Sequence, residues 1–359
     1  MFDSDDEFLC ENDDVDDSYK EFMEKLPPKM IESQGKLADF KHVTFLARGS
    51  FGRVFKAVSP DGSEVALKKL SLNQYGSRRR ELAFRESLRE VKILDKLDHP
   101  NIARLKQLVV KGTSVYLVIE YCPYQLKKLA SRSLAEGFIK AVMADLMNGL
   151  SYIHEQKLVH RDIKVDNLML RNGQLKIADF GSTGNVHQKE WTPQVVTLWY
   201  RPPEILLGSP SQSTAVDIWS AGCVFGELLR SKPLFAGHGE IAQINLIVDM
   251  LGTPTSDEWP EIDELPVLQC MALNKRVSTI EQKIPAREST LDLLKRMLRY
   301  KPEKRCTARE CLRDEYFSQN PSPYTPAEVD KFCRTRAADN GDVDRAKKIL
   351  KLDVSIEES

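Results

Sequence analysis

The chain has 359 residues, of which 42% are hydrophobic and 29% are charged, and its formal net charge is −1. These values are typical of a soluble globular protein, and the length fits one domain of two lobes with a tail at each end. No apolar run approaches the ~20 residues that a membrane-spanning helix needs, and the acidic start is unlike a signal peptide. We therefore expect no membrane partner.

Charge is distributed unevenly along the chain. The first 17 residues contain nine acidic residues and no Lys or Arg, so the remainder is mildly basic. A block of like charges repels itself and is usually disordered. The sequence therefore predicts a disordered acidic leader over residues 1–36.

The seven cysteines are scattered along the chain. They form no C-x-x-C pair, and no histidine lies at a spacing suited to zinc. An odd, scattered set of this kind indicates reduced thiols inside the cell. We therefore expect a protein of the nucleus or the cytoplasm.

From Phe40 onward the pattern changes to short alternating runs with glycine turns. Apolar residues recur every third position from Leu88 to Leu97, with charges between them, which predicts an amphipathic helix over 81–97. Runs rich in Val, Phe and Tyr predict strands on either side of this helix, over residues 45–58, 64–70 and 115–121. We expect a small sheet with one helix up to about residue 121.

Helical periodicity dominates the rest of the chain. The clearest predicted helices cover residues 134–155, 215–231, 239–252 and 288–298. The segment 158–204 is rich in loops, and P-S-P-Y-T-P at 321–326 indicates the end of the domain. The last residues, 319–359, then form a C-terminal tail in which we expect one helix.

Chemistry concentrates in the loop-rich segment. Residues 160–167 read H-R-D-I-K-V-D-N, and a D-F-G motif begins at Asp179. Phosphoryl transfer needs such a set, because its transition state is stabilised mostly by positioning and by neutralising phosphate charge. Asp162 can accept a proton from a substrate hydroxyl, and Lys164 can offset charge on the moving phosphoryl group. Asn167 and Asp179 can hold magnesium through oxygen.

This pair of motifs resembles the eukaryotic protein kinases. The resemblance implies an α+β, bilobal kinase fold over residues 40–318, with ATP and Mg²⁺ as cofactors. A small β-rich N-lobe with one regulatory helix would cover 40–121, and a larger helical C-lobe would cover 122–318. The implied catalytic residues are Asp162, Lys164, Asn167 and Thr197, and the implied metal ligands are Asn167 and Asp179.

The ATP half of the site is carried by the first lobe. Residues 47–54, A-R-G-S-F-G-R-V, match the glycine-rich loop of kinases, except that Ala47 replaces its first glycine. Glycines let backbone N–H groups approach phosphates closely. Lys68 in V-A-L-K resembles the strand lysine that grips the α- and β-phosphates, and Glu90 resembles its acidic partner on the helix.

Residues 119–122 resemble the hinge that offers backbone groups to adenine. In many relatives an acid just beyond the hinge meets the ribose, but the aligned position here is Gln125, which puts that contact in doubt. The ATP-binding residues that the resemblance implies are Ala47, Gly49, Gly52, Val54, Ala66, Lys68, Glu90, Ile119, Glu120, Cys122 and Gln125.

Residues 191–204, W-T-P-Q-V-V-T-L-W-Y-R-P-P-E, closely match the activation segment of cyclin-dependent kinases. In that family the position of Thr192 carries the activating phosphate, and the position of Thr197 hydrogen-bonds the catalytic aspartate. Glu204 and Arg305 match a buried ion pair that anchors the segment.

Other positions that match this family concern the catalytic loop and the substrate. Asp217 matches the acid that braces the catalytic loop. Val195, Val196 and Arg201 occupy positions that shape a pocket for a proline after the phosphorylated residue. The implied substrate is therefore a protein with Ser-Pro or Thr-Pro.

Several stretches resemble one branch of the family, the transcription-elongation kinase that pairs with cyclin T. They are G-S-F-G-R-V-F-K-A, V-M-A-D-L-M-N-G-L-S-Y-I-H and the doubled proline of W-Y-R-P-P-E. That branch phosphorylates the heptad tail of RNA polymerase II. The resemblance implies a T-type cyclin bound through the helix that carries Glu90, a nuclear location (with the cytoplasm as the alternative) and no direct contact with nucleic acid.

The sequence departs from the family at the phosphothreonine clamp, which normally has three arginines. Arg89 and Arg161 match two of them, but the third position is Gly184. A phosphate that carries about −1.5 to −2 charge is best held by several cations. We therefore expect phosphorylation of Thr192 to activate more weakly, or to need another basic group.

Two further departures concern regulation. The loop and helix start at 71–88 are long and basic and lack the proline of the family, so this segment can select a different cyclin. The inhibitory threonine–tyrosine pair of cell-cycle members aligns with Ser50 and Phe51. Because phenylalanine cannot be phosphorylated, we expect that brake to be absent.

Two other functions fit parts of the sequence. A mitogen-activated kinase also prefers proline after its target, but such kinases carry a T-x-Y pair where this chain has Trp191-Thr192-Pro193. A pseudokinase scaffold would bind partners without catalysis, and Ala47 and Gly184 are the only hints in its favour. The lysine, catalytic aspartate and metal ligands that pseudokinases usually lose are all retained.

Overall fold

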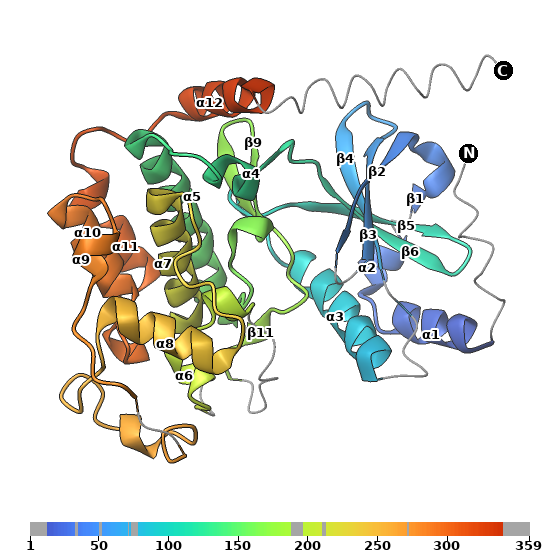
Figure 1. Cartoon of the computed structure of the whole chain (residues 1–359). Helices are drawn as coiled ribbons and strands as arrows, with labels where there is room; N and C mark the ends of the chain where they lie inside the picture. Colours follow the sequence, from blue (N-terminus) through green and yellow to red (C-terminus); the bar gives the residue numbers. More distant parts are fainter. Residues whose placement is uncertain are drawn as a thin grey trace. The chain divides into compact units, whose positions relative to one another are not determined.

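The computed structural model describes residues 13–32, 35–49, 52–70, 72, 78–187, 197–209, 213–270 and 273–339 (Figure 1). The chain divides into two compact units. The first unit comprises Met1–Tyr121 with Asp179–Thr183, and the second comprises Cys122–Ala178 with Gly184–Ser359. The chain passes from the first unit to the second after Tyr121, which is where the sequence predicts the boundary between the lobes.

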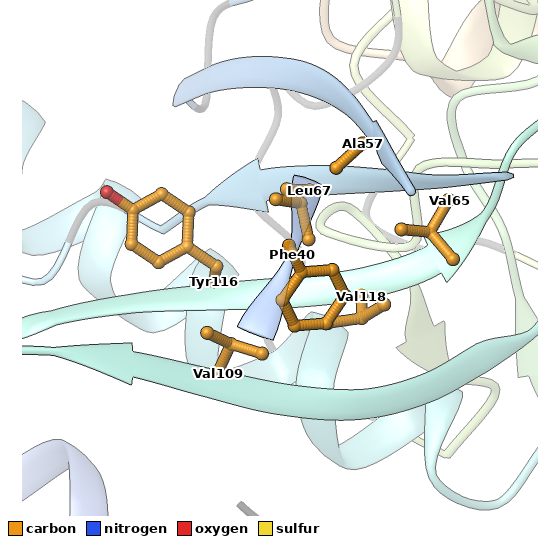
Figure 2. Packing of buried hydrophobic residues seen from close by; sticks show 7 residues of the cluster. All are labelled: Phe40, Ala57, Val65, Leu67, Val109, Tyr116 and Val118. Atoms are coloured by element: carbon orange, nitrogen blue, oxygen red, sulfur yellow. The ribbon is translucent and has the colours of Figure 1, made fainter. Parts of the chain in front are cut away.

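The first unit is built on a six-stranded sheet with the order β1-β5-β6-β4-β3-β2. Side chains alternate across the sheet, so that Val65 and Leu67 of β4 are both buried on one face while their neighbours are less so. Figure 2 shows the apolar cluster that these side chains form with others, which include Phe40, Val109 and Val118. The strands are β1 (Gly35–Lys36), β2 (Lys41–Gly49), β3 (Gly52–Val58), β4 (Glu64–Lys69), β5 (Leu105–Lys111) and β6 (Ser114–Glu120).

One long helix of the first unit, α3 (Arg78–Leu94), matches the amphipathic pattern. Its Phe84, Val91 and Leu94 are buried, as the apolar spacing requires. Glu90 is buried with them, although a lone carboxylate would be costly there. A charged partner must therefore meet Glu90.

The prediction of a disordered leader was wrong for residues 13–32. They form α1 (Asp13–Glu24) and α2 (Pro28–Glu32), and the side chains of Phe22, Leu26 and Met30 are buried. Four of the nine acidic residues of the leader, at positions 13, 14, 16 and 17, fall in the first turns of α1, where the helix dipole favours negative charge. Residues 1–12 lie outside the described part of the chain.

The second unit is mainly helical and is organised around α7 (Ala215–Arg230). Every residue from Val216 to Leu228 is buried, which is typical of a helix surrounded by others. Helices α5 (Glu136–Glu155) and α10 (Glu288–Met297) pack on it. The remaining described α-helices are α4 (Leu126–Ala130), α6 (Pro203–Leu206), α8 (Glu240–Leu251), α9 (Ile280–Lys283), α11 (Ala308–Leu312) and α12 (Pro326–Asp339).

Short strands flank several loops of the second unit. One sheet has the order β10-β9-β7 and another pairs β11 with β8. The strands are β7 (Tyr124–Gln125), β8 (Leu158–Val159), β9 (Leu168–Arg171), β10 (Gln174–Ile177) and β11 (Gly184–Asn185). Segment 160–167 therefore starts directly after β8 and ends directly before β9.

The C-terminal tail is tied to the second unit. Lys140 of α5 is fully buried, and its Nζ donates to the carbonyl oxygens of Gln319 (2.7 Å) and Pro321 (3.0 Å). Beyond this tie the described chain continues into α12, whose Phe332 packs against Phe138. Within the described residues no helix is both long and apolar enough to cross a membrane.

A bidentate ion pair lies inside the second unit. Arg305 Nη1 and Nη2 donate to the two carboxylate oxygens of Glu204 at 2.7 and 2.6 Å, and both side chains are almost completely buried. Arg305 also donates to the carbonyl oxygens of Arg299, Tyr300 and Ala215. The guanidinium is thus saturated, which is the condition for burying such a pair without a large penalty.

We predict that Glu204→Gln lowers the free energy of unfolding by about 3 kcal/mol or more, because it leaves a buried guanidinium without its counter-charge. Chemical denaturation measures the change. Glu155→Gln is the matched control, since its ion pair with Arg309 is exposed and such pairs contribute ~1 kcal/mol or less. Equal effects of the two variants would contradict the importance of the buried pair.

Candidate active site

Lys68 lies in the middle of the sheet of the first unit, where β4 pairs with β3 on one side and β6 on the other. Its Nζ lies 2.7 Å from each carboxylate oxygen of Glu90 and 3.0 Å from Oδ1 of Asp179. Burial alone would lower the pKa of Lys68, but Glu90 and Asp179 together raise it above its ordinary value. The lysine is therefore a fixed cation at neutral pH.

Asp179 begins the D-F-G motif and has a φ of +66°, an unusual conformation for a residue with a side chain. Phe180, which follows it, is fully buried, and residues 179–183 belong to the first unit. Arg89 Nη1 donates to the carbonyl oxygen of Gly181 at 3.2 Å. The sequence assigns Arg89 to a phosphate clamp, and in this structure it binds the D-F-G segment.

Residues of the glycine-rich loop lie at the ends of β2 and β3. Gly49 pairs directly with Gly52, and Ala47 pairs with Val54. Ser50 and Phe51, which bear on the inhibitory brake, lie outside the described residues. Ala47 is exposed on its strand, so replacement of the first glycine does not disturb the pairing of the two strands.

The hinge residues are divided between the two units. Ile119 pairs with Ala66 in the sheet, and Glu120 Oε1 accepts the backbone N–H of Arg104. Cys122 and Gln125 belong to the second unit, and Gln125 lies in β7 opposite Met169. The structure thus brings most of the predicted ATP residues into the first unit and places these two with the second.

Segment 160–167 and Thr197 form a compact hydrogen-bonded group in the second unit. Asp162 Oδ1 accepts from Thr197 Oγ1 at 2.7 Å, and Asp162 Oδ2 accepts from Lys164 Nζ at 2.7 Å. Lys164 Nζ also donates to Thr197 Oγ1 at 3.0 Å. Asn167 Nδ2 donates to Oδ2 and to the carbonyl oxygen of Asp162. The four predicted catalytic residues are therefore in direct contact.

Asp217 of α7 holds this segment from behind. Its carboxylate accepts the backbone N–H groups of His160 and Arg161, each at 2.8 Å, and lies 2.9 Å from His154 Nε2. Burial would raise the pKa of Asp217, but the hydrogen bond and charge of His154, with the other donors, lower it below the ordinary value. Arg161 adopts φ +66° and its side chain is fully buried.

The side-chain oxygen of Asn167 suits a divalent metal ion that prefers oxygen ligands. Asn167 uses its amide nitrogen for the two hydrogen bonds to Asp162, which leaves its amide oxygen for a metal ion. Among the described residues no cluster of three or more His, Cys, Asp or Glu could hold a metal by itself. Mg²⁺ usually takes one or two protein oxygens together with substrate phosphates, and the amide oxygen of Asn167 is a ligand of this kind.

Several regulatory predictions fall partly outside the described residues. Thr192, Val195 and Val196 are not described. Gly184, at the third clamp position, is buried in β11 and pairs with Val159. Arg201 Nη1 binds Glu240 Oε1 at 2.5 Å.

The sequence pattern did not predict the contact of His154 with Asp217 or the helices of the leader. His154 carries no motif of its own, because its contact with Asp217 depends on how α5 and α7 pack. The leader did carry a signal, since Val15, Tyr19, Phe22 and Leu26 recur at helical spacing.

Comparison with known proteins agrees with this geometry. Residues 40–317 match the family described as protein kinase domain. The chain is 38% identical over 309 residues to cyclin-dependent kinase 10 of Rattus norvegicus, which covers 83% of this chain and 85% of that protein. It is 36% identical over 337 residues to cyclin-dependent kinase 11A of Homo sapiens, which covers 89% of this chain and 42% of that protein.

The chain belongs to the cyclin-dependent kinase family. The predicted kinase fold is therefore confirmed, as is its class as a serine/threonine protein kinase. A protein kinase domain uses ATP and a divalent metal ion. The elongation branch is a finer statement than these similarities reach, and it stays a prediction.

We predict that Asp217→Asn lowers the melting temperature of this kinase at pH 7, since the amide cannot accept all the donors that meet the carboxylate. The folded pKa of Asp217 is lowered from 3.8, so its ionised form adds stability above that value and loses it as pH falls further. The difference between wild type and variant should therefore shrink below about pH 4.

Calorimetry from pH 3 to 8 measures this difference. Asp249→Asn is a suitable control, because Asp249 forms an exposed pair with Arg276. A gap between wild type and Asp217→Asn that does not change with pH would contradict the role of the charge.

Proposed function

We propose that this protein is an ATP-dependent, proline-directed serine/threonine kinase that a cyclin activates. The observation that carries the proposal is the group around Asp162, in which Lys164, Thr197 and Asn167 all donate to its carboxylate. A pseudokinase would have no need to orient an aspartate through three donors.

Asp162 is proposed to accept the proton of the substrate hydroxyl. Its carboxylate has about four lone-pair sites, so three donors fix its orientation and leave capacity for one more hydrogen bond. Lys164 supplies a positive charge beside this oxygen, suited to the charge that develops on the phosphoryl group. Thr197 connects Lys164 with Asp162 and keeps both in place.

Lys68 is proposed to bind the phosphates of ATP. Its amino group stays protonated, because the carboxylates of Glu90 and Asp179 lie beside it. Mg²⁺, held by Asn167 and Asp179, would neutralise phosphate charge. Backbone N–H groups of residues 49–52 would complete the phosphate contacts.

Substrate choice and activation are proposed from the family positions. Val195, Val196 and Arg201 would accept the proline of Ser-Pro or Thr-Pro. At the family's clamp positions, Arg89 and Arg161 would bind the phosphate of Thr192, and Gly184 offers no third cation, so another basic group would be needed to replace it. Activation by this phosphate would then be weaker than with three arginines.

The partner is proposed to be a cyclin that contacts the helix of Glu90, with a T-type cyclin as the first candidate. Transcription machinery in the nucleus, such as the RNA polymerase II heptad tail, is the corresponding substrate. The proposal is supported by the resemblance of several motifs to the elongation branch. The names of the relatives, cyclin-dependent kinases 10 and 11A, support a cyclin partner without specifying its type.

We predict that Asp162→Asn reduces turnover by at least ~100-fold and leaves ATP affinity nearly unchanged, because the residue serves the transfer step. Steady-state kinetics and nucleotide binding measure the two effects. The control is Asp166→Asn, which removes from the same loop a carboxylate whose ion pair with Lys127 is exposed. Full activity of Asp162→Asn would refute the proposed base.

We further predict that a purified T-type cyclin raises activity toward a Ser-Pro heptad peptide, whereas a Ser-Ala peptide stays unreactive. A panel of other purified cyclins, assayed in parallel, tests the branch. Stimulation by a different cyclin alone would exclude the T-type partner and keep the cyclin-dependent mechanism. Lack of stimulation by every cyclin would contradict cyclin activation.

A further inference from the structure

The leader is built into the first unit at three successive points. Strand β1 pairs in parallel with β5, through Gly35 with Val109 and Lys36 with Val110. Helix α2 lies against β5. Helix α1, in blue at the start of the chain in Figure 1, then lies beside α3.

The contact between α1 and α3 is aromatic. The rings of Phe22 and Phe84 meet edge to face, with centroids 5.8 Å apart and planes at 79°. Phe22 is completely buried and Phe84 is 2% exposed. Lys25 Nζ adds a cation 5.9 Å from the centre of the Phe84 ring. Such pairs favour one geometry as well as burying apolar area.

Phe84 is six residues before Glu90 on the same helix, about 9 Å along the axis. A helix transmits position along its length, because its backbone hydrogen bonds make it stiff over a few turns. A displacement or rotation of α3 at Phe84 would therefore move Glu90 relative to Lys68. The two 2.7 Å contacts between Lys68 and Glu90 depend on α3 staying in place.

We propose that α1 is an intramolecular brace of α3, in which Phe22 is a positioning residue that keeps Glu90 in contact with Lys68. The leader thus gives the chain its own support for the helix that carries Glu90. A partner protein that uses this face of α3 must fit around α1 or displace it. The expected change in ATP affinity rests on the proposed role of Lys68 in ATP binding. The expected change in hydrogen exchange of α3 does not.

The test uses the full chain with Phe22→Ala and, as a matched control on the same helix, Glu24→Ala, whose side chain is exposed. Hydrogen exchange of residues 78–94 is measured without nucleotide, and ATP affinity is measured separately. Phe22→Ala should speed exchange in α3 by about 5-fold or more and weaken ATP binding by a similar factor. Glu24→Ala should change neither.

Two further variants keep the result interpretable. Phe22→Leu retains apolar bulk without the ring and should give an intermediate effect, even if Phe22→Ala perturbs folding. Combining Phe22→Ala with Phe84→Ala should add little to the stronger single variant, because the two residues act on each other. Exchange in α3 that is unchanged in both Phe22 variants would overturn the brace.

The brace and the proposed ATP site fail in different ways. Lys68→Met should weaken ATP binding strongly while α1 remains on α3. If Lys68→Met left ATP affinity unchanged, the role of Lys68 would be wrong, and the exchange experiment would still decide the brace. Faster exchange in α3 with normal ATP affinity would overturn the link from Phe22 to Glu90.

Discussion

A carboxylate without water must find several donors, and Asp217 meets this demand through the backbone of the catalytic segment. It accepts N–H groups from His160 and Arg161 and contacts His154 of a neighbouring helix. Because α7 is buried along most of its length, Asp217 is anchored in a helix that other elements surround. Because Asp162 directly follows Arg161, these backbone hydrogen bonds also fix the position of Asp162.

The same requirement recurs at the other buried charges of the molecule. Lys68 meets two carboxylates in the first unit, and Arg305 meets Glu204 and three carbonyl oxygens in the second. Buried ion pairs contribute little net stability compared with apolar side chains of the same size. Their value here lies in geometry, since each holds a segment that a kinase must present in one conformation.

The proposed regulation involves both the chain's own leader and a partner protein. Arg89 binds the backbone of Gly181, so a phosphate on Thr192 would compete with an existing contact. The brace from α1 would give α3 a support that does not depend on a partner. With Gly184 at the third clamp position, the proposed brace would make the position of α3 depend more on packing and less on phosphate than the family pattern predicts.

Motifs with local chemistry could be predicted well. H-R-D-I-K-V-D-N, D-F-G and V-A-L-K specify residue types at fixed spacing, and the kinase fold follows from their combination. Strands β2, β3, β4 and β6 and the main helices were also predictable, because their apolar periods are regular, whereas β1 and β5 were not predicted. The leader was the main error, since its charge outweighed the helical spacing of Val15, Tyr19, Phe22 and Leu26.

The sequence by itself determined the chemistry, because a lysine, two aspartates and an asparagine at these spacings have few other uses. Only the tertiary structure decided which groups meet. The contacts of His154 with Asp217, Phe22 with Phe84 and Arg89 with Gly181 join residues from different elements. Such contacts depend on how helices and loops pack in three dimensions, and a one-dimensional pattern does not contain that information.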